Sequence, residues 1–474
     1  MKKEDILYTP TPEEAQEYLA YETEQDIFDN LSGGLESLEN MHFEPGEKKT
    51  KLIAGAMVAF DKGTVDFLNK LAKKDTEYKY VLLSEVTAEF RRKTRECIEF
   101  EHVCTPHLLA KEIRLLHFAV SVPEEVEGYV RQREYLIRAQ QNLLGRHKDM
   151  EESYAEVLVY YADQYITRLL EIVQPEVVIL WNQFYAFHMI FAQICKRKRI
   201  EIQYMEFGCV PGTFVLEREG QQGESYPAKH PQEFKQLAIS RQELLEAGAV
   251  SQYIYKACLN RNVQPPYGKL DETLVRYRSG RPVIAYFGQN DYESGLFPYT
   301  EDSRRYHSPF LQSSKEGLEL LHLLSIKNNW TLLYKPHPLI ASLGTDRGEG
   351  EVRNCVRVHD MNIHEVIDCA DVVVTVLSQS AYEALFRDKP VVMMGYTQLR
   401  GSGAVYEAYG FHKVERTIKK ALRRGYTRGK KQCFMRHLAC LLKYCLMDDR
   451  SHPDFLYGMA VGEFINKWNT KEIF

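Results

Sequence analysis

Residues 371–383 read Asp371-Val-Val-Val-Thr-Val-Leu-Ser-Gln-Ser-Ala-Tyr-Glu383, an apolar, largely β-branched run that passes through two serines into a helical pattern. A short apolar run bounded by a turn is typical of a buried parallel strand. The stretch therefore predicts a strand, a turn and a helix in succession, which is the building unit of α/β domains.

The same alternation continues on both sides of this stretch. It predicts strands at 282–287, 330–335, 371–376 and 390–394, separated by helices at 313–326, 363–369 and 380–387. An earlier series predicts strands at 52–59, 78–83, 176–181 and 200–205, with a long helical pattern within 123–173. Strands that alternate with helices form parallel sheets covered on both faces, so two such sheets are expected.

The length of 474 residues also favours two domains, because single cores stop growing near ~250–300 residues. We expect an extension over 1–50, Rossmann-like domains over 51–265 and 280–445, and a C-terminal helix within 446–474 that could return to the first domain. The expected fold is α/β, with two parallel-sheet domains facing across a cleft. Ligands of open α/β sheets bind at the carboxyl ends of the strands.

The bulk composition limits the classes of protein. A formal net charge of -5 gives no general attraction for nucleic acid. The ten cysteines form no Cys-x-x-Cys pair, the N-terminus lacks the apolar stretch of a signal peptide, and no window approaches the ~20 apolar residues of a bilayer span. A cytoplasmic protein without a nucleic-acid partner is expected.

The strand at 330–335 ends in Lys335-Pro-His337-Pro338. Pro336 removes a backbone donor and Pro338 disfavours a helical conformation at His337, so a stiff turn presents two side chains that can carry positive charge. Such a turn suits a phosphate. A histidine that only satisfies a loop carbonyl is the alternative, and the tetrapeptide alone does not separate the two.

The serine turn, Leu377-Ser-Gln-Ser380, precedes the helix predicted at 380–387. Free amide donors at a helix start bind phosphate, and the hydroxyls of Ser378 and Ser380 can add hydrogen bonds. The alternative is a capping box, in which Ser380 and Glu383 satisfy the helix's own donors; for this segment alone it is favoured. The occurrence of both turns on successive strands favours a phosphate site.

Two further loops carry candidate groups. Gln289, Asp291 and Ser294 follow the strand at 282–287, where a ligand-binding loop and a solvated turn explain them almost equally well. Glu206 ends the strand at 200–205, beside Gly208, and would act as a general base if burial raised its pKa. The alternative role for Glu206 is capping a nearby loop or helix.

The segment Lys413 to Arg436 is densely basic and contains the single acid Glu415. It fits peripheral contact with an anionic membrane surface, and it fits a solvated helical face equally well.

With these residues in view, the chain resembles the capsule polysaccharide biosynthesis family of GT-B glycosyltransferases, which includes bacterial β-Kdo transferases. The resemblance rests on Tyr334-Lys-Pro-His-Pro338, Val374-Thr-Val-Leu-Ser-Gln-Ser-Ala-Tyr-Glu-Ala-Leu385 and Met205-Glu-Phe-Gly-Cys-Val-Pro-Gly-Thr-Phe-Val-Leu216. It is strongest from about Pro175 to Tyr409. Two departures stand out: Glu217, where the family often has Asp, and Ala381, where it has Gly.

The resemblance implies an acceptor-side first domain and a nucleotide-sugar-binding second domain. It implies that His337, Ser378 and Ser380 hold the donor phosphate, with support from Lys335, Gln289 and Asp291. It also implies that Glu383 lies near the ribose. Glu206 would then be the acid/base on the acceptor side. CMP-Kdo is the favoured donor, a surface polysaccharide or glycolipid is the acceptor, and no cofactor or metal is expected. The alternatives are a teichoic-acid-type polyol-phosphate transferase and a non-catalytic glycan-binding subunit.

Overall fold

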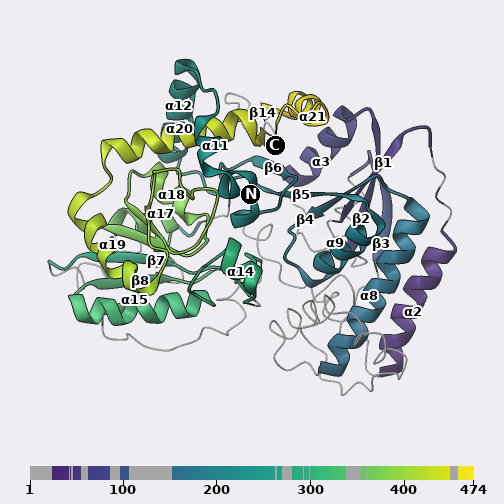
Figure 1. The fold of residues 1–474 in the computed structure, drawn as a ribbon, viewed down its shortest axis with the longest axis horizontal. Coiled ribbons are helices and arrows are strands. Elements are labelled where there is room, and N and C mark those ends of the chain that lie inside the picture. Colours follow the sequence, from purple (N-terminus) through teal and green to yellow (C-terminus); the bar gives the residue numbers. More distant parts are fainter. Residues whose placement is uncertain are drawn as a thin grey trace.

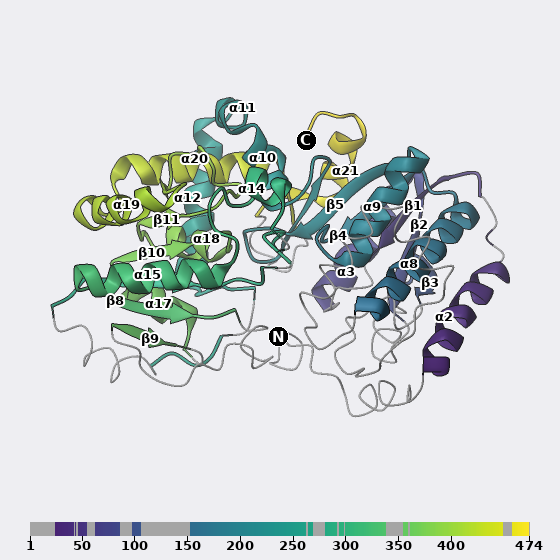
Figure 2. The same cartoon turned by 60° about the horizontal axis from the view of Figure 1, so that its bottom comes forward.

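The computed structural model describes residues 24–41, 43, 46–54, 62–85, 97–105, 152–261, 264–268, 280–291, 293–297, 299–337, 354–358, 361–448 and 457–473. They form two α/β domains, each built around one sheet (Figure 1). A turned view keeps the two sheets apart, with helices packed on each (Figure 2). The predicted fold class of two Rossmann-like domains is confirmed.

The sheet of the second domain has the strand order β12-β11-β10-β7-β8-β9, with every pair parallel. Its strands are β7 (Val283–Phe287), β8 (Thr331–Lys335), β9 (Cys355–Arg357), β10 (Val372–Thr375), β11 (Val391–Met393) and β12 (Tyr406–Glu407). Its helices are α14 (Glu301–Tyr306), α15 (Ser314–Asn328), α17 (Ile363–Cys369), α18 (Ser380–Phe386), α19 (Phe411–Arg424) and α20 (Arg428–Tyr444). The apolar runs read from the sequence are its buried central strands.

The sheet of the first domain has the order β14-β13-β6-β5-β4-β1-β2-β3. Its strands are β1 (Lys49–Ala54), β2 (Tyr78–Glu85), β3 (Glu101–Thr105), β4 (Val177–Trp181), β5 (Glu201–Phe207), β6 (Thr213–Glu217), β13 (Leu446–Asp448) and β14 (Met459–Ala460). β6 is antiparallel to both β5 and β13, so the expectation of an entirely parallel sheet is wrong at this strand. The reason is the five-residue connection at 208–212, since a parallel crossover needs about a dozen residues.

Helices α2 (Glu24–Glu39), α8 (Glu152–Val173) and α9 (Ala186–Lys198) cover one face of this sheet. Helices α3 (Lys62–Lys74) and α21 (Val461–Asn469) cover the other. The strand predicted at 52–59 falls outside the described residues beyond Ala54. The helical pattern predicted within 123–173 falls outside them before the start of α8.

The chain crosses between the domains. After β6 it forms a 3-10 turn, η2 (Gln222–Glu224), and the helices α10 (Tyr226–Lys229), α11 (Pro231–Gln236) and α12 (Arg241–Lys256). Helix α12 packs on α18 and α20, and its Val250 and Ile254 share a core with Val283 of the second sheet. The chain returns from α20 directly into β13, so its C-terminal end completes the first sheet. No described helix combines the length and apolar character required to cross a bilayer.

Trp468 anchors the return segment to the first domain. Its side chain is 1 % exposed, stacks on Phe464 at 5.6 Å and lies under the Arg218 guanidinium at 3.6 Å. Truncation of a buried tryptophan costs about 3–5 kcal/mol, so Trp468→Ala should lower the melting temperature by roughly 10 °C. Lys467→Ala, on the outer face of the same helix, should change it by a degree or two. Equal shifts in the two thermal scans would contradict this anchoring role.

Candidate functional site

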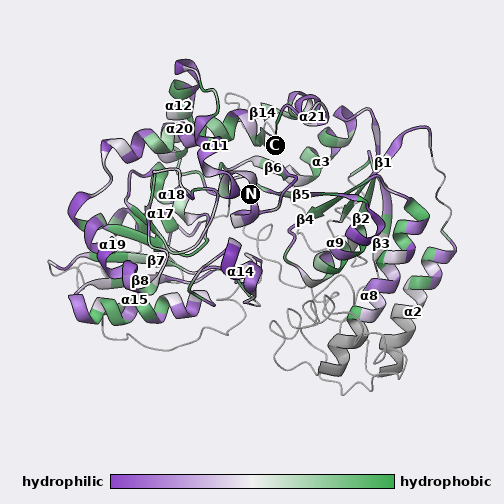
Figure 3. Cartoon of the chain, in the orientation of Figure 1, coloured by the Kyte–Doolittle hydropathy of each residue, from purple (hydrophilic) through white to green (hydrophobic). Residues whose placement is uncertain are grey.

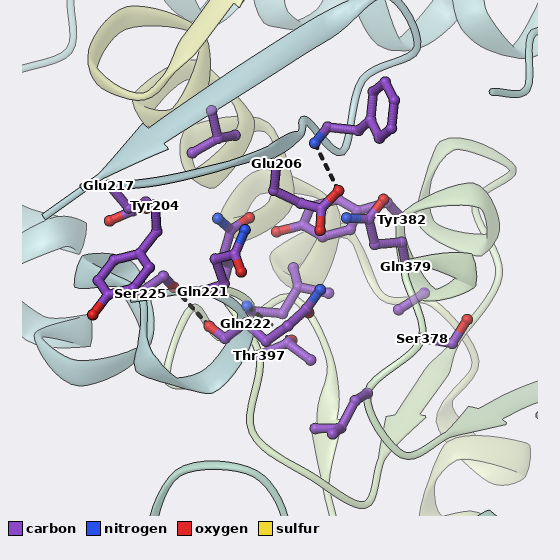
Figure 4. A pocket seen from close by; sticks show the side chains of 16 residues that line it. Tyr204, Glu206, Glu217, Gln221, Gln222, Ser225, Ser378, Gln379, Tyr382 and Thr397 are labelled. Carbon is purple, nitrogen blue, oxygen red and sulfur yellow. Dashed lines mark hydrogen bonds between the residues drawn. The ribbon is translucent and has the colours of Figure 1, made fainter. Parts of the chain in front are cut away.

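A pocket lies between the two domains (Figure 4). The first domain contributes β5, β6 and the residues around η2, and the second contributes the loops that follow β10 and β11. The polar residues that line it are Tyr204, Glu206, Glu217, Gln221, Gln222, Ser225, Ser378, Gln379, Tyr382, Thr397 and Gln398. The pocket therefore lies where parallel strands of both sheets end, as expected for open α/β folds.

The pairing of β5 with β6 delivers two carboxyl groups into this pocket. Tyr204 pairs with Glu217 and Glu206 with Val215. Directly opposed residues of an antiparallel pair share a face, so all four side chains point the same way. The intervening residues, Met205, Phe214 and Leu216, point into the core of the first domain.

Glu217 is the most perturbed acid of the pocket. It is 3 % exposed, its Oε2 accepts a hydrogen bond from the Tyr226 N–H at 3.2 Å, and its Oε1 has no partner among the described residues. Burial raises the pKa of Glu217 to about 8, against the opposing effect of the Tyr226 N–H. At neutral pH this carboxyl therefore holds a proton within the pocket.

Sequence reasoning named Glu217 as a departure from the family pattern and missed it as a site residue. The sequence signal for Glu217 was an acidic residue at the end of a buried apolar run, Thr213–Glu217. In the structure Glu217 lies on the same face of β6 as Val215 and pairs with Tyr204 of β5.

Glu206, predicted as the acid/base, does lie in the pocket and is half-buried. Its carboxylate accepts the N–H of Phe207 at 2.9 Å. Burial raises the pKa of Glu206, Arg261 and that N–H oppose the rise, and Glu293 adds to it. The guanidinium of Arg261 lies over the Phe207 ring at 4.2 Å. Arg261 and Glu293 are two charged neighbours that the sequence reasoning did not name.

His337 follows β8 and is half-buried. Burial lowers its pKa, Glu293 acts to raise it and Arg261 acts to lower it. Glu206 and His337 thus share the same two charged neighbours, which places them in one electrostatic environment between the domains. The burial of His337 favours a neutral imidazole over the cation expected from the sequence.

The Lys335 ammonium donates to the Met361 carbonyl at 2.8 Å. One of its three donors is therefore used within the protein, and the charge is held in place beside the start of α17.

The serine turn does not form the capping box that the local sequence favours. Helix α18 begins at Ser380, and its N-cap is Gln379, with no side-chain cap. Glu383 instead accepts from Asn260 Nδ2 at 3.1 Å and contacts His364 Nε2 at 3.3 Å. The buried Ser380 hydroxyl has no partner among the described residues. Tertiary contacts have taken Glu383 away from the local motif.

Ser378 lines the pocket, whereas Ser380 lies behind it. The Ser378 hydroxyl accepts the Ser380 N–H at 3.2 Å, and the Ser378 N–H donates to Thr375 Oγ1 at 3.3 Å. The turn is therefore closed by its own hydroxyls before any ligand arrives.

Gln289 and Asp291 lie behind the pocket wall as supports. Gln289 Oε1 accepts the Leu377 N–H at 2.7 Å, and its Nε2 donates to Ser294 Oγ at 3.0 Å. Asp291 Oδ2 accepts from both the N–H and the hydroxyl of Ser314, at 2.9 and 3.1 Å. Burial raises the pKa of Asp291 to about 6. These residues position the serine turn and α15 rather than line the cavity.

Contacts beside the pocket join the domains. The Tyr185 hydroxyl donates to Glu293 Oε1 at 3.0 Å, and Asn182 Nδ2 donates to the Glu293 carbonyl at 3.1 Å. His307 Nε2 lies 3.3 Å from Glu224 Oε1. The site is thus built at an interface held by several polar contacts.

Two Rossmann-like domains that share a pocket at the carboxyl ends of their strands form the GT-B arrangement. Residues 298–427 match the family model described as capsule polysaccharide biosynthesis protein. That span contains the His337 turn, the serine turn and Glu383, so the resemblance predicted from the sequence is confirmed there. No curated protein sequence gives a significant match to the chain.

Solved structures with similarity to the chain include the β-Kdo 2,7 transferase of Thermosulfurimonas dismutans KpsC, with 18% identity over 65% of this chain and 89% of that one and a TM-score of 0.38. The β-Kdo 2,4 transferase of the same protein has 16% identity over 56% and 79%, with a TM-score of 0.39. Methanocaldococcus jannaschii UDP-GlcNAc 2-epimerase has 9% identity over 82% and 98%, with a TM-score of 0.34.

The raised pKa of Glu217 makes stability depend on pH. The folded protein binds this proton more tightly than the unfolded chain, so the contribution is full below about pH 4.5 and is lost as pH rises toward about 8. Glu217→Gln removes the loss. Relative to wild type, the variant should gain on the order of a few kcal/mol between pH 5 and pH 8.

Melting temperatures of wild type and Glu217→Gln at pH 5 and pH 8 measure this effect. Glu246→Gln, an exposed change on α12, serves as the control and should follow wild type at both pH values. A Glu217→Gln difference that stays constant with pH would show that the carboxyl titrates normally.

Proposed function

We propose that the protein is a glycosyltransferase that moves a sugar from a nucleotide-sugar donor to a hydroxyl of a surface polysaccharide or glycolipid. The observation that carries the proposal is the pocket between the domains. There, Glu206 and Glu217 of the first domain face the serine turn of the second, whose sequence matches the capsule polysaccharide biosynthesis family.

The donor's phosphate is assigned to the second-domain side of the pocket. Ser378 lines the cavity. Lys335 at the end of β8 and His337 two residues later do not line this cavity; they are assigned to the phosphate as a fixed cation and an imidazole of the same domain. Gln289 supports the turn through the Leu377 N–H, so its contribution is positional. Preorganised donors of this kind stabilise the charge that develops on a leaving phosphate.

Glu383 needs rearrangement to serve its expected role near the ribose. Both of its carboxylate oxygens already contact Asn260 or His364. A ribose at this position would have to share or replace one of those contacts.

The acceptor is assigned to the first-domain side. In the proposed step the acceptor oxygen bonds to the anomeric carbon, the bond from that carbon to the donor phosphate oxygen breaks, and the phosphate keeps the electron pair. Glu206 takes the proton of the acceptor hydroxyl, for which its raised pKa is suited. Glu217, protonated near neutral pH, donates a hydrogen bond to a substrate oxygen.

CMP-Kdo is the donor that the resemblance favours. The phosphate-binding groups are shared by any CMP, CDP or UDP sugar, so the experiment must offer each nucleotide separately.

A thermal-shift series with CMP, CDP, UDP and GDP tests the donor site. At saturating concentration one nucleotide should raise the melting temperature by several degrees, because a ligand that binds only the folded state stabilises it. His337→Ala and Ser378→Ala should reduce the shift, whereas His412→Ala, an exposed histidine on α19, should keep it. The donor site is refuted if no nucleotide shifts wild type.

Transfer assays with labelled nucleotide sugars test the acceptor side. Glu206→Gln should lower kcat by roughly 10²–10⁴-fold while leaving the nucleotide shift intact, because it removes the base without touching the donor site. Glu201→Gln, an exposed change at the start of the same strand, is the matched control. Unchanged turnover in Glu206→Gln would exclude that residue as the base.

A further inference from the structure

The segment 413–436, which covers most of α19 and the first half of α20, carries a concentrated positive charge on a chain whose net charge is negative. Of the 61 Lys and Arg residues in the chain, ten lie within 413–436, against one of its 66 Asp and Glu residues. Helix α19 buries Val414, Ile418 and Ala421 against the second sheet. The helix lies at the end of the second domain farther from the first, and its ribbon is mostly coloured as hydrophilic in Figure 3.

The structure separates the cations of this segment into two groups. Lys419 pairs with Glu415 at 2.7 Å, Lys431 pairs with Asp388 at 2.6 Å, and Arg436 donates to the carbonyls of Lys235 and Leu237. Lys430 donates to the Gly403 and Val405 carbonyls. These four side chains are used within the fold.

The remaining cations form what we call the basic face: Lys413, Arg416, Lys420, Arg423, Arg424 and Arg428. All six are exposed, and none has an acidic partner among the described residues. The first five of them lie on α19, where three- and four-residue spacing brings them to one side of the helix. That side is opposite the buried Val414 and Ile418, so the five side chains project together. A shallow groove beside Tyr406 and Thr417 continues the surface.

Two exposed apolar side chains lie on the other sides of α15 and α19, away from the basic face. Phe411, at the start of α19, is 54 % exposed although it contacts Phe310, and Leu323 on α15 is 65 % exposed. Helices α15 and α19 are held together by the Lys327–Glu415 ion pair. The basic face itself therefore presents charge alone, and each cation held near an anionic lipid surface contributes about 1 kcal/mol of attraction.

We propose that the basic face, formed by α19 and the start of α20, binds the surface of a membrane rich in anionic phospholipid. This surface is separate from the pocket between the domains, so the inference stands independently of the proposed transfer reaction. The proposal assigns membrane contact to six side chains of the segment 413–436, those with no acidic partner in the described part of the chain. Attraction of this kind falls off within a Debye length and therefore weakens with salt.

Vesicle co-sedimentation tests the proposal, with phosphatidylcholine alone and phosphatidylcholine mixed with phosphatidylglycerol. Wild type should bind the anionic vesicles only and should be released at about 1 M salt. The triple variant Arg416→Gln, Lys420→Gln, Arg423→Gln should bind roughly 100-fold more weakly, since each cation near the lipid contributes about fivefold.

The matched control is Lys256→Gln, Lys315→Gln, Lys471→Gln, which removes the same three charges from exposed positions on other elements. It should bind anionic vesicles like wild type. The single variant Arg416→Gln, about fivefold weaker, provides a second measurement if the triple variant does not fold. Failure of wild type to bind anionic vesicles, equal loss in both triple variants, or binding to dextran sulfate without vesicle binding would each overturn the proposal.

Discussion

The antiparallel pairing of β6 is the constraint on which the rest of the structure depends. β6 is hydrogen-bonded to β5 on one side and to β13, from the other end of the chain, on the other. One face of β6 packs Phe214 on Phe67, with ring centroids 3.7 Å apart, in the first core. The other face presents Val215 and Glu217 to the second domain. A slip of one residue would put Leu216 in the pocket and Glu217 in the core, so both cores fix the register.

The position of Glu217 opposes stability. A buried carboxyl with an unpartnered oxygen costs free energy, and the protein holds it because the strands on both sides over-determine its place. The Ser380 hydroxyl is a second buried polar group without a partner in the described part of the chain, just behind the serine turn. Buried polar groups without a partner occur elsewhere among the described residues too, so it is the pocket beside Glu217, rather than the unpartnered oxygen alone, that marks this carboxyl as a ligand contact.

Most of the second domain could be predicted from the sequence, because its strands are continuous apolar runs and its helices have local start signals. The helix expected at 363–369 is α17, Ile363–Cys369. Strands β6, β13 and β14 were not predicted, since their two to five residues become strands through pairing with partners that are distant in sequence or reached by a tight turn. The same limit applies to the site. Glu206 lies near the end of the strong strand β5 and Ser378 follows β10, whereas Glu217, Arg261 and Glu293 contribute to the site only through the tertiary fold. The capping-box pattern at Ser380 failed because Asn260 and His364 hold Glu383 elsewhere.

The loop after β7 connects the two sides of the pocket mechanically. At one end, Gln289 accepts the Leu377 N–H and so sets the start of the serine turn. Four residues later, Glu293 is held by Tyr185 and Asn182 of the first domain. If the domains move apart and Glu293 moves with them, the displacement reaches the serine turn through this short segment. Asp291, within the same segment, accepts two further hydrogen bonds from Ser314 of α15. Because Glu293 also influences the pKa values of both Glu206 and His337, this contact between the domains modifies the electrostatics that burial imposes on the site.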